Sequence, residues 1–168
     1  MQTIPKHGVW RLARIAVVAL ALLPGMHPMA DDSVEPSAIA IVVHKDSQVD
    51  DLSLTDLRSI FLADQQFWPD STRIILLVRA PQSDERDFVL NRIYQMSEAQ
   101  FRQYWIAKMF RAEVPRGPKI VFSTDMTLDL VVAIPGSISF MRADEVVNSV
   151  KVVRVDGKLP ADPGYPLK

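Results

Sequence analysis

A short loop after a predicted buried strand places an arginine and a serine four residues apart, just before a predicted helix. The strand covers residues 73–78, the loop begins with Arg79, and Ser83 stands at the expected helix N-cap. Backbone N–H groups at a helix start have no acceptor within the helix and carry a partial positive charge. A guanidinium adds a planar set of donors that suits a tetrahedral oxyanion. These residues predict a small anion site at the end of the strand.

The residues that follow Ser83 complicate this prediction, because Asp84 and Glu85 are acidic and Arg86 is basic. The N–H groups of Asp84 and Glu85 would complete a nest for the anion, whereas their carboxylates would repel a doubly charged one. Arg86 is a candidate second anion contact, and its alternative role is that of a solvated helix residue. Arg79 has the alternative of a surface ion pair with either carboxylate, and Ser83 caps the helix under both interpretations.

Three further hydroxyl residues stand at the ends of predicted strands, where open α/β sheets gather ligands: Ser47, Ser123 and Thr124. Helix or turn capping is the simpler role for each. His44 is the single histidine beyond residue 30 and the chain has no cysteine, so we expect no transition-metal site. No G-x-S-x-G elbow, phosphate-binding P-loop or H-E-x-x-H motif is present. We therefore expect neither an enzyme nor a bound cofactor.

The first thirty residues have the pattern of a signal peptide. Three basic side chains precede an apolar run at residues 15–23, which is short for a membrane span, and a Pro-Gly pair ends it. We expect cleavage near Ala30, a flexible leader at residues 31–38, and one domain at 39–168. A retained N-terminal anchor is the alternative. Cleavage would place the protein in the periplasm without stable membrane insertion.

The charge balance of the remaining chain excludes one class of partner. The sequence has 19 basic and 20 acidic residues, and three of the basic ones precede residue 31, which leaves a net charge near −4. A mildly acidic chain without a basic run gives no electrostatic basis for nucleic-acid binding. Any anion site must therefore be local.

Strand and helix patterns alternate along the domain, which is typical of an α/β fold. The predicted strands are residues 39–43, 73–78, 119–122, 137–141 and 151–155, and the predicted helices start at 54, 84, 98 and 124. In the third helix the side chains at 101, 104, 105, 108 and 109 recur at helical spacing and form a largely aromatic stripe, which we expect to face the core.

In the order and spacing of its motifs the chain resembles the phosphate-binding proteins of bacterial ABC phosphate uptake, in the type II periplasmic binding protein superfamily. The matching segments are residues 57–62 with 68–70, Arg79 with Ser83, 132–140 and, more weakly, 165–167. The resemblance implies a mixed sheet flanked by helices, forming a single lobe. It also implies that Arg79, Ser83 and the following N–H groups hold phosphate.

The chain departs from the family in two respects. Asp84 and Glu85 replace the glycine and threonine that the family places after the serine, and the chain is about half the length of a two-lobed binding protein. The resemblance implies a periplasmic solute-binding-like protein for phosphate or a similar oxyanion, associated with an ABC permease. The alternative is a binding-protein lobe repurposed as a non-ligand-binding partner of another envelope protein.

Overall fold

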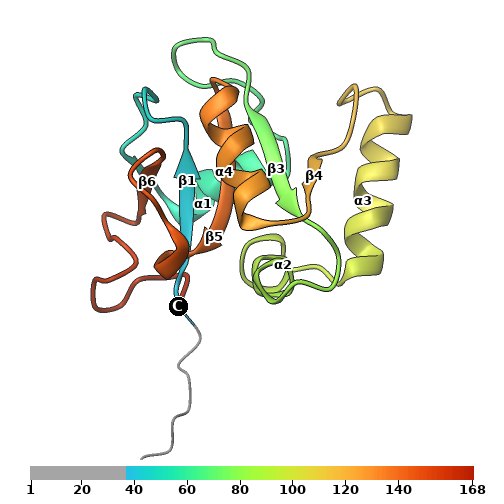
Figure 1. The fold of residues 1–168 in the computed structure, drawn as a ribbon. Coiled ribbons are helices and arrows are strands. Elements are labelled where there is room, and N and C mark those ends of the chain that lie inside the picture. The colour runs from blue at the N-terminus through green and yellow to red at the C-terminus, as the bar shows by residue number, and fades with distance from the viewer. Residues whose placement is uncertain (1–36) are drawn as a thin grey trace, which may run out of the picture. The chain divides into compact units, whose positions relative to one another are not determined.

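The computed structural model describes residues 37–168, and the expected signal peptide lies outside this range, as does most of the expected leader. The described part is built on a mixed six-stranded sheet with helices on both faces (Figure 1), which confirms the predicted α/β class. The strand order is β2-β6-β1-β5-β3-β4. The strands are β1 (Ile39–Val43), β2 (Asp51–Leu52), β3 (Ile75–Arg79), β4 (Lys119–Val121), β5 (Ser137–Arg142) and β6 (Lys151–Val155).

The strand directions decide which loops can form a site together. β3 runs parallel to both β4 and β5, whereas β1 runs antiparallel to β5 and to β6. The carboxyl ends of β3, β4 and β5 therefore share one edge of the sheet. The end of β1 lies at the opposite edge, because Val43 pairs with Ile138 near the start of β5. We call these the carboxyl edge and the amino edge.

Strand β1 shows why the sheet is covered on both faces. All five of its residues are buried apolar side chains, as the continuous apolar run predicts for a central strand. Ile39, Ile41 and Val43 belong to one core cluster, whereas Ala40 and Val42 belong to the other. This alternation follows from the two-residue period of a strand.

The larger core lies under α1 (Leu54–Phe61), α2 (Asp84–Val89), the π-helix η1 (Leu90–Tyr94) and α3 (Glu98–Phe110). The smaller core lies under α4 (Thr124–Ala133). A short 3-10 turn, η2 (Ala143–Glu145), follows β5. Serine side chains cap α1, α2, α3 and α4, and α3 carries a full capping box between Ser97 and Gln100.

Two helix predictions need correction. The helix predicted from residue 84 to about 95 is α-helical only to Val89 and continues as a π-helix, which ends at Gln95 in the left-handed conformation. In α3 the apolar stripe buries Phe101 and Trp105, but Met109 is 41% exposed. The stripe is narrower than the spacing suggests because the covered side of α3 faces η1 and the segment after α1, where Tyr104 and Lys108 donate to the Leu62 carbonyl.

Two features outside the regular elements hold parts of the chain in place. At the predicted Pro135-Gly136 turn, Gly136 has a φ of +81°, and a Cβ there would lie 2.4 Å from the carbonyl oxygen of Arg73, so only glycine fits. The carboxyl-terminal tail is irregular, as its prolines predict, yet Tyr165 is buried and donates to the Ile39 carbonyl at 2.8 Å.

Within residues 37–168 no helix is long and apolar enough to cross a bilayer.

Candidate functional site

Arg79 is the last residue of β3 and lies at the carboxyl edge, as predicted. Its side chain is only 13% exposed, and its Nε lies 3.9 Å from Oε2 of Glu85. The Nη1 atom is buried and has no hydrogen-bond partner among residues 37–168. A buried guanidinium nitrogen without an acceptor is costly, so an ion, water or other acceptor at this atom would be favourable. Arg79 therefore keeps donor capacity that Glu85 does not satisfy.

Ser83 begins α2 as the expected N-cap, and its hydroxyl accepts a hydrogen bond from the Arg86 backbone N–H at 3.3 Å. The next two N–H groups, those of Asp84 and Glu85, belong to the first turn, where no intrahelical acceptor exists. The Asp84 side chain is exposed, whereas that of Glu85 is 12% exposed and faces Arg79. Of the two carboxylates, Glu85 is thus the one that competes with an anion for Arg79.

Arg86 has neither of the two roles expected for it, which were a second anion contact and a solvated helix residue. Its side chain is only 2% exposed. Its guanidinium donates to both carboxylate oxygens of Glu98, at 2.8 and 3.0 Å, and to the Arg79 carbonyl at 2.6 Å. It also stacks over the Phe101 ring, with 4.7 Å from Cζ to the ring centroid. Arg86 thus joins α2, β3 and α3, and its donors face protein acceptors. The alternative of a solvated helix residue is wrong.

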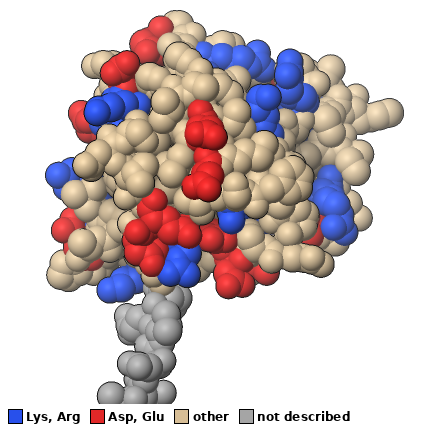
Figure 2. Space-filling view, in the orientation of Figure 1, with Lys and Arg blue, Asp and Glu red and all other residues tan. Residues whose placement is uncertain are grey.

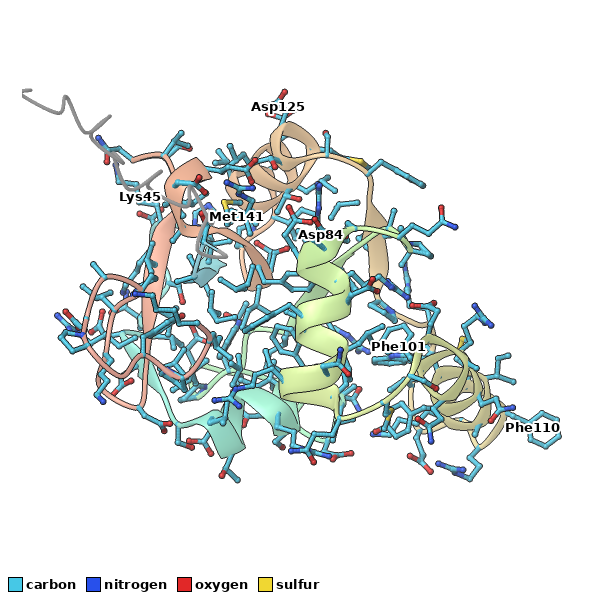
Figure 3. All side chains as sticks on the ribbon, turned by 90° about the horizontal axis from the view of Figure 1, so that it is seen from below. Lys45, Asp84, Phe101, Phe110, Asp125 and Met141 are labelled. Atoms are coloured by element: carbon cyan, nitrogen blue, oxygen red, sulfur yellow. The ribbon has the colours of Figure 1, made fainter. Side chains whose placement is uncertain are left out.

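Ser123 and Thr124 lie at the same edge, since β4 ends at Val121, which pairs with Arg79. The Ser123 hydroxyl accepts from the Met126 N–H at 3.1 Å and so caps α4. The Thr124 hydroxyl donates to Oε2 of Glu145 at 3.0 Å. In Figure 3, which looks onto this end of the sheet, Asp84 marks the start of α2 and Asp125 that of α4. The two helix starts thus face the same side of the molecule.

The remaining cation at this edge also has an internal partner. Arg142 ends β5 and donates to Asp144 at 2.7 Å from Nη2. This hydrogen bond raises the pKa of Arg142, and the charges of Asp144, Glu145 and Glu85 act in the same direction. Figure 2 shows acidic side chains gathered over the lower part of the molecule, below α4. The carboxyl edge therefore carries more carboxylates than cations.

The structure does not bring Ser47 to this group. Ser47 follows β1, so it lies at the amino edge, where its hydroxyl accepts from the Val49 N–H at 3.3 Å and its carbonyl from Lys151 at 2.7 Å. It lines a pocket of about 500 Å³ together with Trp68 and Gly136. Arg79, Ser83, Ser123 and Thr124 thus form one candidate site, and Ser47 is separate from it.

Sequence reasoning missed the acidic partners of this site, Glu98, Glu145 and Asp144. Glu98 follows the capping serine of α3 and is twelve residues from Arg86, so no local spacing links them. Glu145 and Asp144 come just after β5. Because β5 ends at the same edge as Arg79, their position after this strand was the signal that could have identified them. Within residues 37–168 no three His, Asp or Glu side chains gather in a way that could hold a metal ion.

Solved structures of phosphate-binding proteins share this fold. An ABC-type phosphate transport receptor from Vibrio cholerae matches with a TM-score of 0.63 and 19% identity, over 78% of this chain and 53% of that one. PstS from Borrelia burgdorferi matches with a TM-score of 0.60 and 16% identity, over 74% and 49%. A phosphate-binding protein from Stenotrophomonas maltophilia gives 0.55 and 17%, over 74% and 40%.

These matches confirm the predicted resemblance in fold, and the chain spans about half the length of the solved structures it matches. The matched proteins are a phosphate transport receptor and phosphate-binding proteins. No family model and no curated protein sequence matches the chain. The fold is thus that of a periplasmic-binding-protein lobe.

Proposed function

We propose that the protein is a periplasmic solute-binding-like protein that holds phosphate or a similar oxyanion at Arg79 and Ser83. The observation that carries the proposal is the buried Nη1 of Arg79, which has no hydrogen-bond partner within residues 37–168 and lies beside the start of α2. The names of the structures that share the fold support an oxyanion as the ligand class. In this proposal an ABC permease is the receiving partner.

The ligand must compete with Glu85 for Arg79. A carboxylate oxygen 3.9 Å from the guanidinium Nε is attracted to it but is too far for a hydrogen bond. Repulsion between Glu85 and an anion grows with the charge of the anion, so a monoanion is favoured over a dianion. We therefore expect weak phosphate binding that improves when the Glu85 charge is removed.

The experiment is calorimetric titration with phosphate and sulfate of the natural protein, of Arg79→Ala, and of the double variant Asp84→Gly with Glu85→Thr. The double variant should bind phosphate at least tenfold more tightly, because two nearby negative charges are removed. Arg79→Ala should abolish binding through the loss of its charge-assisted donors. Arg154→Ala is a matched control, because Arg154 is an exposed arginine on β6, which β1 and β5 separate from β3. Absence of phosphate heat from both the natural protein and the double variant would reject the proposal.

One observation favours the second candidate, an envelope interaction protein that uses this lobe without a ligand. Phe122 is 73% exposed and Met126 is 36% exposed on either side of Ser123, so an apolar surface adjoins the acidic carboxyl edge. Exposed aromatic and methionine side chains are enriched at protein interfaces. If no oxyanion binds, this candidate takes the place of the first.

A further inference from the structure

A second pocket, away from Arg79, lies at the amino edge between the start of β3, the start of β4, α3 and the loop before β4. It has a volume of about 300 Å³, which is at the lower end for small-molecule sites. Its wall includes Ile60, Ile74, Leu76 and Val114 from the core. We refer to it as the Trp105 pocket, because the Trp105 ring forms part of its lining.

Three basic residues border this pocket, Arg73, Arg116 and Lys119, and no acidic residue does. All three are exposed, and none has an ion-pair partner within residues 37–168. The carboxylate nearest in sequence to Arg116, that of Glu113, pairs with Arg111 and lies 3.9 Å from Lys108. Arg73 stacks on Phe67, with 5.7 Å from Cζ to the ring centroid. The pocket mouth therefore has an uncompensated positive charge on a domain that is acidic overall.

The Trp105 indole adds an unsatisfied donor. Trp105 is 5% exposed, and its Nε1 is buried without a hydrogen-bond partner within residues 37–168. The other indole of the described chain, that of Trp68, donates to the Gly136 carbonyl at 3.0 Å. A buried N–H without an acceptor is unfavourable, so an acceptor supplied by a bound molecule would stabilise this wall. Because the nitrogen is closed to solvent, binding must shift a neighbouring pocket side chain.

We propose that the Trp105 pocket binds a small organic carboxylate. Its apolar body would pack on Ile60, Ile74 and Leu76, and its carboxylate would lie among Arg73, Arg116 and Lys119. Figure 2 shows basic side chains at the upper right of the molecule without acidic ones beside them, on the side where α3 and β4 lie in Figure 1. This site is separate from the one at Arg79, because it lies at the opposite edge of the sheet.

The test uses nuclear magnetic resonance of the ¹⁵N-labelled full chain, with benzoate and hexanoate as probes. The indole N–H signals are assigned with the variants Trp105→Phe and Trp68→Phe. Both probes should shift the Trp105 signal saturably and leave the Trp68 signal in place. Benzyl alcohol, which has the ring without the charge, should bind at least tenfold more weakly, since charge-assisted hydrogen bonds contribute roughly that much. Inorganic phosphate, which has the charge without the apolar body, should not shift the Trp105 signal.

The double variant Arg116→Gln with Lys119→Gln should weaken benzoate binding by roughly tenfold or more, since it removes two of the three cations. Both side chains are exposed, so the fold should persist. Lys45→Gln is the matched control: Lys45 is also exposed, and it lies on the side of the molecule away from α3 (Figure 3). The proposal fails if neither probe shifts the Trp105 signal, if benzyl alcohol binds as tightly as benzoate, if phosphate shifts the signal as much, or if Lys45→Gln weakens binding equally.

Discussion

The basic residues of the two sites differ in whether the protein supplies them with carboxylate partners. At the carboxyl edge Arg79, Arg86 and Arg142 face Glu85, Glu98 and Asp144, respectively. At the amino edge the three cations of the Trp105 pocket have no carboxylate partner within residues 37–168. The edge that matches the phosphate-binding family in motif is thus the one whose positive charge the protein itself neutralises. The order of the motifs predicted the fold, whereas the ligand depends on the acceptors that surround Arg79.

The same comparison shows that an arginine at a predicted anion site can belong to the core. Arg86 and Arg79 are seven residues apart, and a hydrogen bond from the Arg86 guanidinium to the Arg79 carbonyl joins them. The Arg86 guanidinium is enclosed by Glu98 and Phe101, whereas the Arg79 guanidinium keeps one donor without a partner within residues 37–168. Burial and partners, rather than residue type, separate the two roles.

The largest expected effect is a loss of protein stability when Arg86 at the carboxyl edge is replaced. Arg86→Met should lower the free energy of unfolding by about 3–5 kcal/mol, because removal of one partner leaves the Glu98 carboxylate without its main counter-ion. Arg102→Met is the matched control, since Arg102 pairs with the same carboxylate at 3.7 Å but is 63% exposed. The control should cost under about 1 kcal/mol. Urea unfolding measures both, and equal losses would show that Arg86 has no special role.

At the other edge, Trp105 should also contribute strongly to the stability of the protein. Trp105→Ala should cost about 3 kcal/mol or more, because the ring is buried against Phe101 and Tyr104. Met109→Ala, on the exposed side of the same helix, should cost much less. Urea unfolding again gives the values. A loss below about 1 kcal/mol for Trp105→Ala would mean that the wall of the pocket contributes little to the core.

The surroundings of Arg86 also show which features of the site could not be predicted from the sequence. Five of the six strands were predictable because their continuous apolar or β-branched runs depend only on local pattern, and residues 39–43 form β1 as expected. Strand β2 was not predicted, because its two residues, Asp51 and Leu52, make no such run. The Arg86–Glu98 pair was not, because two helices must pack before these side chains meet. The separation of Ser47 from Arg79 was not predictable for the same reason: it depends on β1 being antiparallel to β5. Arg79 and Ser83 were predictable because strand, loop and cap are contiguous.

A smaller effect should separate the two carboxylates beside Arg79. Glu85→Gln should raise phosphate affinity several-fold, because the Glu85 side chain is 12% exposed and faces the guanidinium. Asp84→Asn should change the affinity less, since Asp84 is exposed and solvent screens its charge. Calorimetry at low salt measures both variants. A larger gain from Asp84→Asn would place the anion nearer to the start of α2 than to Arg79.

The smallest expected effect is the acid sensitivity of the carboxyl edge, tested at Asp144. The hydrogen bond from Arg142 holds the pKa of Asp144 below its ordinary value of 3.8 in the folded protein. The folded state therefore binds fewer protons at this group than the unfolded state does, and the pair stabilises the fold above pH 3.8, with the contribution lost as the pH falls through the folded pKa. In Asp144→Asn this contribution is absent, so the variant should be slightly less stable than the natural protein at neutral pH. The difference should vanish in acid.

Urea unfolding across this pH range measures the difference in stability between Asp144→Asn and the natural protein. Asp125→Asn is the control, because no ion-pair partner of Asp125 is found within residues 37–168. A stability difference that stays constant with pH would show that the Arg142–Asp144 contact acts through packing rather than through charge.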